Sequence, residues 1–84
     1  MNTLQVYAVN EAQRLGLYVL FERQRGQPVW RIYDATTGDL VLMYYPRDRK
    51  WLTRNDARGE GDARAALNAA AEMVRADRGE RQPA

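Results

Sequence analysis

Residues 17–45 read LYVLFERQRGQPVWRIYDATTGDLVLMYY, which is three apolar runs separated by two groups of turn-forming residues. The first run begins with five apolar, β-prone residues and is too short for a helix of its own. Glycine and proline mark a first turn at 26–28, and Gly38 marks a second turn at 35–39. Because connections this short force neighbouring strands to run antiparallel, the sequence predicts a three-stranded antiparallel meander. Its strands are predicted at 17–25, 29–34 and 40–45.

A helical pattern precedes this meander. Between residues 3 and 15 the apolar side chains recur at intervals of three and four, which places them along one stripe of a helix. Thr3 is the predicted cap of its amino end, and Gly16 is the predicted stop. Residues 4–9 also fit the alternation of a strand, so a strand followed by a shorter helix with Asn10 as its cap is a second interpretation.

The chain after the meander divides into a predicted loop and a second helix. Residues 46–61 are polar, charged and rich in turn-forming residues, which is typical of a long loop. Asp62 then provides an N-cap, and small or apolar residues recur on one face of a helix that Gly79 ends. The predicted fold is therefore α+β, a three-stranded antiparallel meander with two helices packed on one face, in the order α-β-β-β-α. Residues 1–78 form one domain in this interpretation, and 79–84 form a disordered tail.

The residue types present exclude several kinds of chemistry. The 84 residues include no cysteine, histidine or serine, which removes disulfides, thiolate metal sites and the usual catalytic base and nucleophile. We therefore expect a protein that is not an enzyme and that binds no metal or cofactor. The sequence shows neither a secretory leader nor an apolar stretch long enough for a membrane span, so we expect a cytoplasmic protein with no membrane partner.

Basic residues concentrate in the predicted loop, where five cations outnumber Asp48 and Asp56. Arginine forks bind phosphate oxygens, and aromatic rings stack on nucleic-acid bases. The loop therefore predicts a non-catalytic nucleic-acid-binding module, although a merely solvated loop has the same composition. Arg23, Arg25 and Arg31 would join this surface if the strand ends converge on it. The predicted contacts are Arg47, Arg49, Lys50, Trp51, Arg54 and Arg58.

A second candidate surface lies on the predicted sheet. Side chains alternate between the two faces of a strand, both faces here are partly apolar, and helices on one side would leave the other side exposed. Such a patch, or an exposed strand edge, suits a small protein-binding inhibitor or adaptor, of the type that phages and mobile elements encode, and the patch also suits a homodimer. The competing interpretation is that the first helix, or the loop with Trp51, covers the patch. The residues of this patch are Tyr18, Tyr33, Met43 and Tyr45.

The chain also resembles a known family in several places. Residues 9–16, VNEAQRLG, are similar to the first-helix pattern of the double-stranded RNA-binding domain, and 59–61, GEG, with 68–71, NAAA, resemble its glycine turn and alanine-rich second helix. The resemblance spans residues 3–78 and implies the α-β-β-β-α order and an RNA partner. The chain departs from the family where 62–66 lack the lysine cluster that grips phosphates, and where a hairpin loop lacks its histidine.

Overall fold

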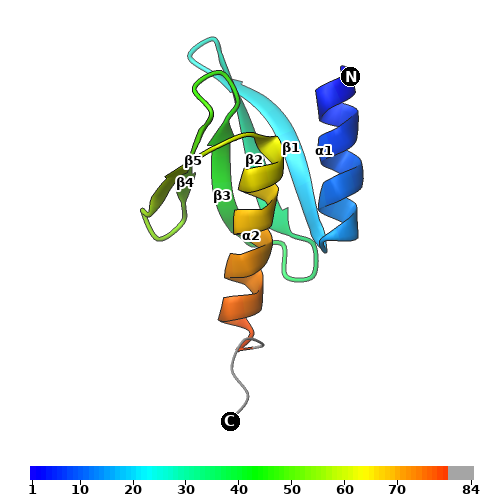
Figure 1. Cartoon of the computed structure of the whole chain (residues 1–84), viewed down its shortest axis with the longest axis vertical. Helices are drawn as coiled ribbons and strands as arrows, with labels where there is room; N and C mark the ends of the chain where they lie inside the picture. Colours follow the sequence, from blue (N-terminus) through cyan, green and yellow to red (C-terminus); the bar gives the residue numbers. More distant parts are fainter. Residues whose placement is uncertain (80–84) are drawn as a thin grey trace.

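The computed structural model describes residues 1–79 and shows an α+β fold of two layers (Figure 1). One layer is a five-stranded antiparallel sheet in the order β1-β2-β3-β4-β5, and the other consists of two helices that begin toward the same end of the sheet. Neither described helix is long and apolar enough to cross a membrane. The elements are α1 (Thr3–Arg14), β1 (Leu17–Gln24), β2 (Gln27–Asp34), β3 (Leu40–Tyr45), β4 (Lys50–Thr53), β5 (Arg58–Glu60) and α2 (Ala63–Asp77).

The first helix forms as the three-and-four spacing predicts, and the alternative of an initial strand is wrong. Its cap is Asn2 and not Thr3. The Asn2 side chain accepts a hydrogen bond from the Gln5 backbone at 2.8 Å, and the Gln5 side chain accepts one from the Asn2 backbone at 3.0 Å. Gly16, with a φ of +76°, ends the helix in the left-handed conformation that favours glycine.

The second helix also begins and ends where the sequence predicts. The Asp62 carboxylate accepts a hydrogen bond from the Ala65 backbone at 2.9 Å, and Gly79 follows the helix with a φ of +75°. Apart from Gly79, the predicted disordered tail lies outside the described residues. The side chains that α2 buries are almost all small, which lets the helix lie close to the sheet, and they are Ala63, Ala66, Leu67, Ala70, Ala71 and Val74.

The first hairpin is tighter than the predicted turn at 26–28. Arg25 and Gly26 both have positive φ, at 55° and 79°, which is the signature of a two-residue hairpin loop. Gln27 and Pro28 therefore belong to β2, where Gln27 pairs with Gln24 of β1. A proline at the start of a strand does not disturb the sheet, because its missing donor lies next to the turn.

The pairing of β2 with β3 contains a bulge. Ile32 pairs with Leu42, but the next residue, Tyr33, pairs with Leu40, so Val41 is an extra residue in β3. Plain alternation would place Val41 on the face of Met43. Instead Val41 is fully buried within the core cluster. Register reasoning from sequence misses this shift because nothing in the local composition marks it.

The predicted long loop at 46–61 is wrong, and with it the prediction of three strands. Residues 46–61 contain a further hairpin, formed by β4 and β5, which extends the sheet from three strands to five. These strands are only four and three residues long and rich in charged residues, so their alternation is too brief to recognise. Their turns also use non-glycine residues with positive φ, Arg49 and Asp56, which composition does not mark.

The core lies between the helices and one face of the sheet. Val19, Ile32 and Leu42 are successive cross-strand partners on this face. Beside them, Trp30 meets Phe21 and Tyr44 edge to face, with ring centroids 5.1 Å and 5.5 Å apart. Aromatic pairs in this geometry add to the free energy that burial of their area provides.

Asp34 is the main buried charge, with only 6% of its surface exposed. Burial raises the pKa of Asp34. The Thr36 backbone, which donates a hydrogen bond at 2.8 Å, and the Arg78 guanidinium at 3.1 Å lower it, and the lowering is the larger effect. The pKa of Asp34 therefore lies below its ordinary value of 3.8. These contacts join the β2–β3 turn to the carboxyl end of α2.

We expect Asp34 to make stability depend on pH in the acid range. Because its folded pKa is lowered, its contribution is complete above pH 3.8 and is lost as the pH falls through the folded pKa. Asp34→Asn should lower the free energy of unfolding at neutral pH and lessen its decline below about pH 4, as measured by urea denaturation. Parallel pH profiles for the variant and the parent would contradict this role.

Candidate nucleic-acid interface

Five exposed cations gather at one end of the sheet, and we call this surface the basic end. Because β1–β2 and β3–β4 are antiparallel hairpins, both turns lie at that end, and α1 begins there too (Figure 1). The Gln27 amide connects the turns by donating a hydrogen bond to the Asp48 carboxylate at 3.0 Å. Arg23 and Arg47 line one hollow together with Asn2. The basic end consists of Arg23, Arg25, Arg47, Arg49 and Lys50.

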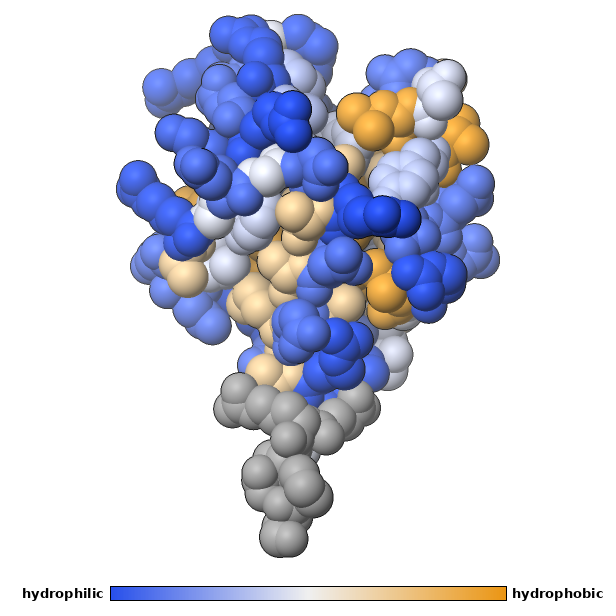
Figure 2. Space-filling view, in the orientation of Figure 1, coloured by the Kyte–Doolittle hydropathy of each residue, from blue (hydrophilic) through white to orange (hydrophobic). Residues whose placement is uncertain are grey.

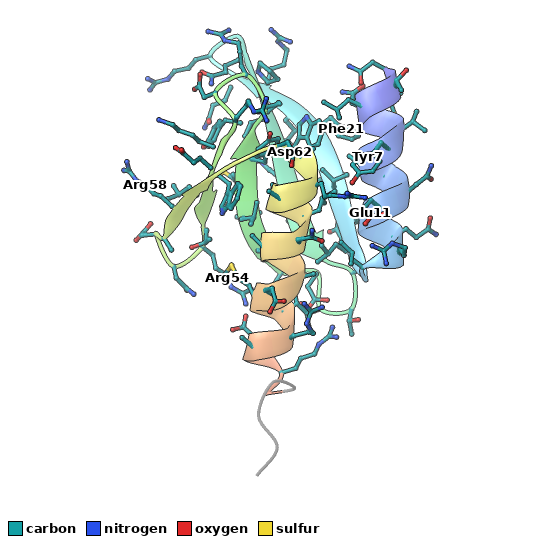
Figure 3. All side chains as sticks on the ribbon, viewed as in Figure 1. Tyr7, Glu11, Phe21, Arg54, Arg58 and Asp62 are labelled. Carbon is teal, nitrogen blue, oxygen red and sulfur yellow. The ribbon has the colours of Figure 1, made fainter. Side chains whose placement is uncertain are left out.

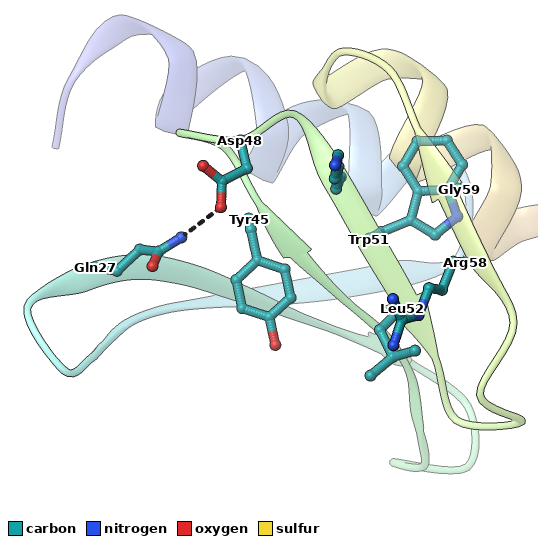
Figure 4. Close-up of a pocket in the computed structure, with 8 residues that line it drawn as sticks. Gln27, Tyr45, Asp48, Trp51, Leu52, Arg58 and Gly59 are labelled. Atoms are coloured by element: carbon teal, nitrogen blue, oxygen red, sulfur yellow. Dashed lines mark hydrogen bonds between the residues drawn. The ribbon is translucent and has the colours of Figure 1, made fainter.

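A pocket of about 360 Å³ lies next to the basic end, over β3, β4 and β5 (Figure 4). Tyr45 and Lys50 are cross-strand partners, as are Leu52 and Arg58, and these four side chains lie on the sheet face opposite the helices. The pocket therefore combines an aromatic ring, an apolar wall and two cations. Its lining residues are Gln27, Tyr45, Asp48, Lys50, Trp51, Leu52, Arg58 and Gly59.

Trp51 forms one wall of this pocket and is anchored there. Its cross-strand partner is Gly59, and a Cβ at residue 59 would overlap the Cε2, Cζ2 and Nε1 atoms of the indole. On the core side the ring lies 6.5 Å from that of Tyr44, centroid to centroid. The predicted stacking group is thus half-buried, and Tyr45 is the aromatic ring on the face that carries Lys50 and Arg58.

We expect Gly59→Ala to destabilise the β4–β5 hairpin. The backbone of Gly59 is not left-handed, so the cost is steric and should be about 1 to 3 kcal/mol, as for other overpacked sites. Urea denaturation followed by tryptophan fluorescence and circular dichroism measures it. In the Trp51→Leu background, where the large ring is gone, the same substitution should cost much less. An equal cost in both backgrounds would show that the ring is not responsible.

Arg54 lies outside the interface that the sequence predicts for it. It is at the far end of β4, where its guanidinium pairs with the Asp77 carboxylate and donates a hydrogen bond to the Leu40 carbonyl at 3.0 Å (Figure 3). Arg54 therefore ties the β4–β5 hairpin to the end of α2. Arg58, by contrast, points away from the helices and into solvent.

The structure divides the six predicted contacts into three groups. Lys50, Trp51 and Arg58 line the pocket, Arg47 and Arg49 belong to the basic end, and Arg54 is on the opposite side. The strand ends converge as predicted for Arg23 and Arg25, which lie with Arg47 and Arg49 at the basic end. Arg31 does not join them, because it lies mid-strand and pairs with Glu22 at 2.6 Å. Sequence reasoning missed Gln27 and Gly59 as residues of the pocket. The available signal was that a glycine, Gly59, follows Trp51 within the same 46–61 segment.

The predicted aromatic patch lies on the sheet face opposite the helices, which we call the open face. The rings of Tyr18 and Tyr33 stack there with their centroids 4.8 Å apart. The Arg31 guanidinium donates a hydrogen bond to the Met43 sulfur at 3.7 Å. Both described helices pack on the other face, and Trp51 turns toward the core, so neither predicted cover is in place. Tyr45 belongs to this face and to the pocket, which makes the two predicted surfaces continuous.

Comparison of the chain with protein-family models, with curated proteins and with solved structures gave no match. Within residues 1–79 no group of three or more acidic, histidine or cysteine side chains is placed to hold a metal ion. What the protein binds must therefore be inferred from its own surfaces. The pocket with the basic end, and the open face, are the surfaces to consider.

Proposed function

We propose that the protein is a non-catalytic nucleic-acid-binding module that holds a single strand in the pocket over β3, β4 and β5. An unpaired base stacks on Tyr45, while Lys50 and Arg58 contact the phosphates on either side of it. The observation that carries this proposal is that one pocket of about 360 Å³ is lined by this ring and both cations. Asp48 lines both this pocket and the hollow of Arg49, so the pocket adjoins the basic end.

The distribution of charge supports the same partner. The whole chain carries a formal charge of only +2, but its charges are separated along the sheet. The five cations of the basic end have only a few acids nearby, whereas four carboxylates lie at the opposite end, two of them paired with Arg54 and Arg78. A polarised molecule of this kind steers a polyanion toward one end, even when its total charge is small. The carboxylates of the opposite end are Asp34, Asp39, Asp56 and Asp77.

A single strand fits this pocket better than a duplex does. Stacking on a protein ring requires a base that is free of its own stack, and single strands supply such bases at little cost. The phosphates then provide affinity with little sequence preference, because their contacts do not read base edges. Duplex RNA, which the resemblance to the double-stranded RNA-binding domain predicts, would meet the cations alone.

We expect fluorescence anisotropy to show binding of labelled single-stranded RNA or DNA at low salt. Affinity should fall steeply as salt rises, and Lys50→Ala/Arg58→Ala should weaken binding and reduce the salt slope by roughly 0.7 per lost phosphate contact. Tyr45→Ala should weaken binding by about 1 to 3 kcal/mol per base with little change in the salt slope. The two variants thus separate charge from stacking.

The control is Arg75→Ala, which removes one cation where the double variant removes two. Arg75 lies in the last turn of α2, pairs with Glu72 at 2.6 Å and is remote from the pocket, so its removal changes the charge without touching the site. An equal loss of affinity in this variant, or no binding of any single strand at low salt, would refute the proposal. Tighter binding of duplex RNA than of single strands would instead favour the mode that the family resemblance implies.

The open face favours a second candidate function, that of a small protein-binding inhibitor or adaptor. The supporting observation is the aromatic and thioether surface of Tyr18, Tyr33 and Met43, which lies on the face that carries no helix. Exposed surfaces of this composition are common in protein interfaces. Tyr33→Ala distinguishes the candidates, because it should leave nucleic-acid affinity unchanged and abolish capture of a protein partner.

A further inference from the structure

The most exposed large apolar side chains of residues 1–79 all belong to the first twenty residues. They lie on α1, on β1 or just before α1, and Figure 2 shows apolar side chains gathered over the α1 side of the molecule. Single exposed apolar residues are ordinary, but their confinement to two neighbouring elements is typical of an interface. They are Met1 at 80% exposure, Leu4 at 47%, Val6 at 46%, Val9 at 36%, Tyr18 at 40% and Leu20 at 43%.

The two edges of the sheet differ in a way that points to the same place. At one edge, β5 has only three residues and carries Arg58 and Glu60, which is how proteins protect an edge from pairing. At the other edge, β1 has eight residues and begins with the uncharged run 17–21. Within residues 1–79 no strand pairs with the outer side of β1. This edge thus keeps a row of backbone groups available to another strand.

The outer stripe of α1 and the edge strand form one continuous surface, which we call the α1–β1 edge. Val9 and Gln13 of α1 line a groove of about 360 Å³ together with Leu17, Tyr18 and Val19 of β1. Val6 lies three residues, or one helical turn, before Val9 and seven residues, or two turns, before Gln13, so it extends the same stripe. A partner at this edge would therefore meet a helix and a strand together.

Charge at the α1–β1 edge suits a second copy of the same chain. Pairing about a two-fold axis brings each group near its own counterpart, so like charges at the centre would repel. Residues 1–10 and 15–21 contain no charged side chain, and the intervening Glu11 and Arg14 pair with each other. The cations of the basic end, which would repel, lie beyond the apolar run.

We propose that the α1–β1 edge joins two copies of this chain into a dimer, with β1 pairing antiparallel to the partner's β1. A lone extended peptide would cover the strand edge but leave Val6 and Val9 of α1 exposed. In a second copy, the partner's β1 would pair with β1 and the partner's α1 would pack against α1, so both elements would be covered. A stable interface buries about 800 Å² on each partner, roughly one seventh of the 5505 Å² of this surface. The α1–β1 edge contains two of the seven elements, so an interface of that size is within its reach.

The dimer is independent of the nucleic-acid proposal, because the two surfaces lie toward opposite edges of the sheet. The pocket lies over β3, β4 and β5, and the dimer edge is β1. Pairing across β1 would form one continuous ten-stranded sheet with a pocket toward each outer side. Each proposal can therefore fail without the other.

The mass of the purified chain in solution tests the dimer. Light scattering after size exclusion at about 100 μM, where a micromolar interface is filled, should give twice the 9.7 kDa of one chain. Leu20→Asp and Val9→Asp should each give the mass of one chain, because each places a pair of like charges in the interface. Both residues are exposed in the single chain, so circular dichroism should show an unchanged fold. Asn68→Asp, which adds the same charge on the exposed side of α2, should remain dimeric.

Several outcomes would overturn the proposal. A parent chain with the mass of one copy at this concentration would show that the α1–β1 edge does not bind its own copy and is open to a different partner. Dimers that survive in both Leu20→Asp and Val9→Asp would place the contact elsewhere on the molecule. Loss of the dimer in Asn68→Asp as well would show that general charge repulsion, and not this edge, controls association.

Discussion

The packing of small helix side chains against large sheet side chains is the contact on which the rest of this structure depends. Alanines of α1 and α2 meet a sheet face that carries Trp30, Ile32 and Tyr44, all nearly or fully buried. Small residues let the helix backbones approach the sheet closely, and the aromatic rings fill the space between them. Because both described helices pack on this face, neither of them covers the open face.

This arrangement explains which parts of the fold the sequence could predict. The helices and the first three strands depend on local periodicity and on caps such as Asp62 and Gly79, and these signals are strong. The β4–β5 hairpin depends instead on Trp51 crossing Gly59, a contact between residues on different strands. The bulge at Val41 likewise depends on the pairing of two strands. Neither contact can be predicted from the local sequence, because each depends on how two strands pair.

The candidate site shows the same division between local and distant information. Composition identified the cations of the 46–61 segment, but only the hairpin within it decides where they point. It turns Lys50 and Arg58 outward beside Tyr45, and it sends Arg54 to the other end, to Asp77. Charge counting treats these cations as equal. Their positions place the first two at the pocket and the third in a contact between the β4–β5 hairpin and α2.

The shared direction of the helices adds a property that no side chain carries. Both α1 and α2 begin toward the basic end (Figure 1), so their peptide dipoles point the same way. Each aligned helix is equivalent to roughly half a positive charge at its amino terminus, where Asn2 caps α1 and Asp62 caps α2. The backbone itself is therefore electrically polarised along the sheet. The two dipoles therefore add to the potential of the cations at that end, and their contribution comes from the backbone, so it would remain if the cations were neutralised.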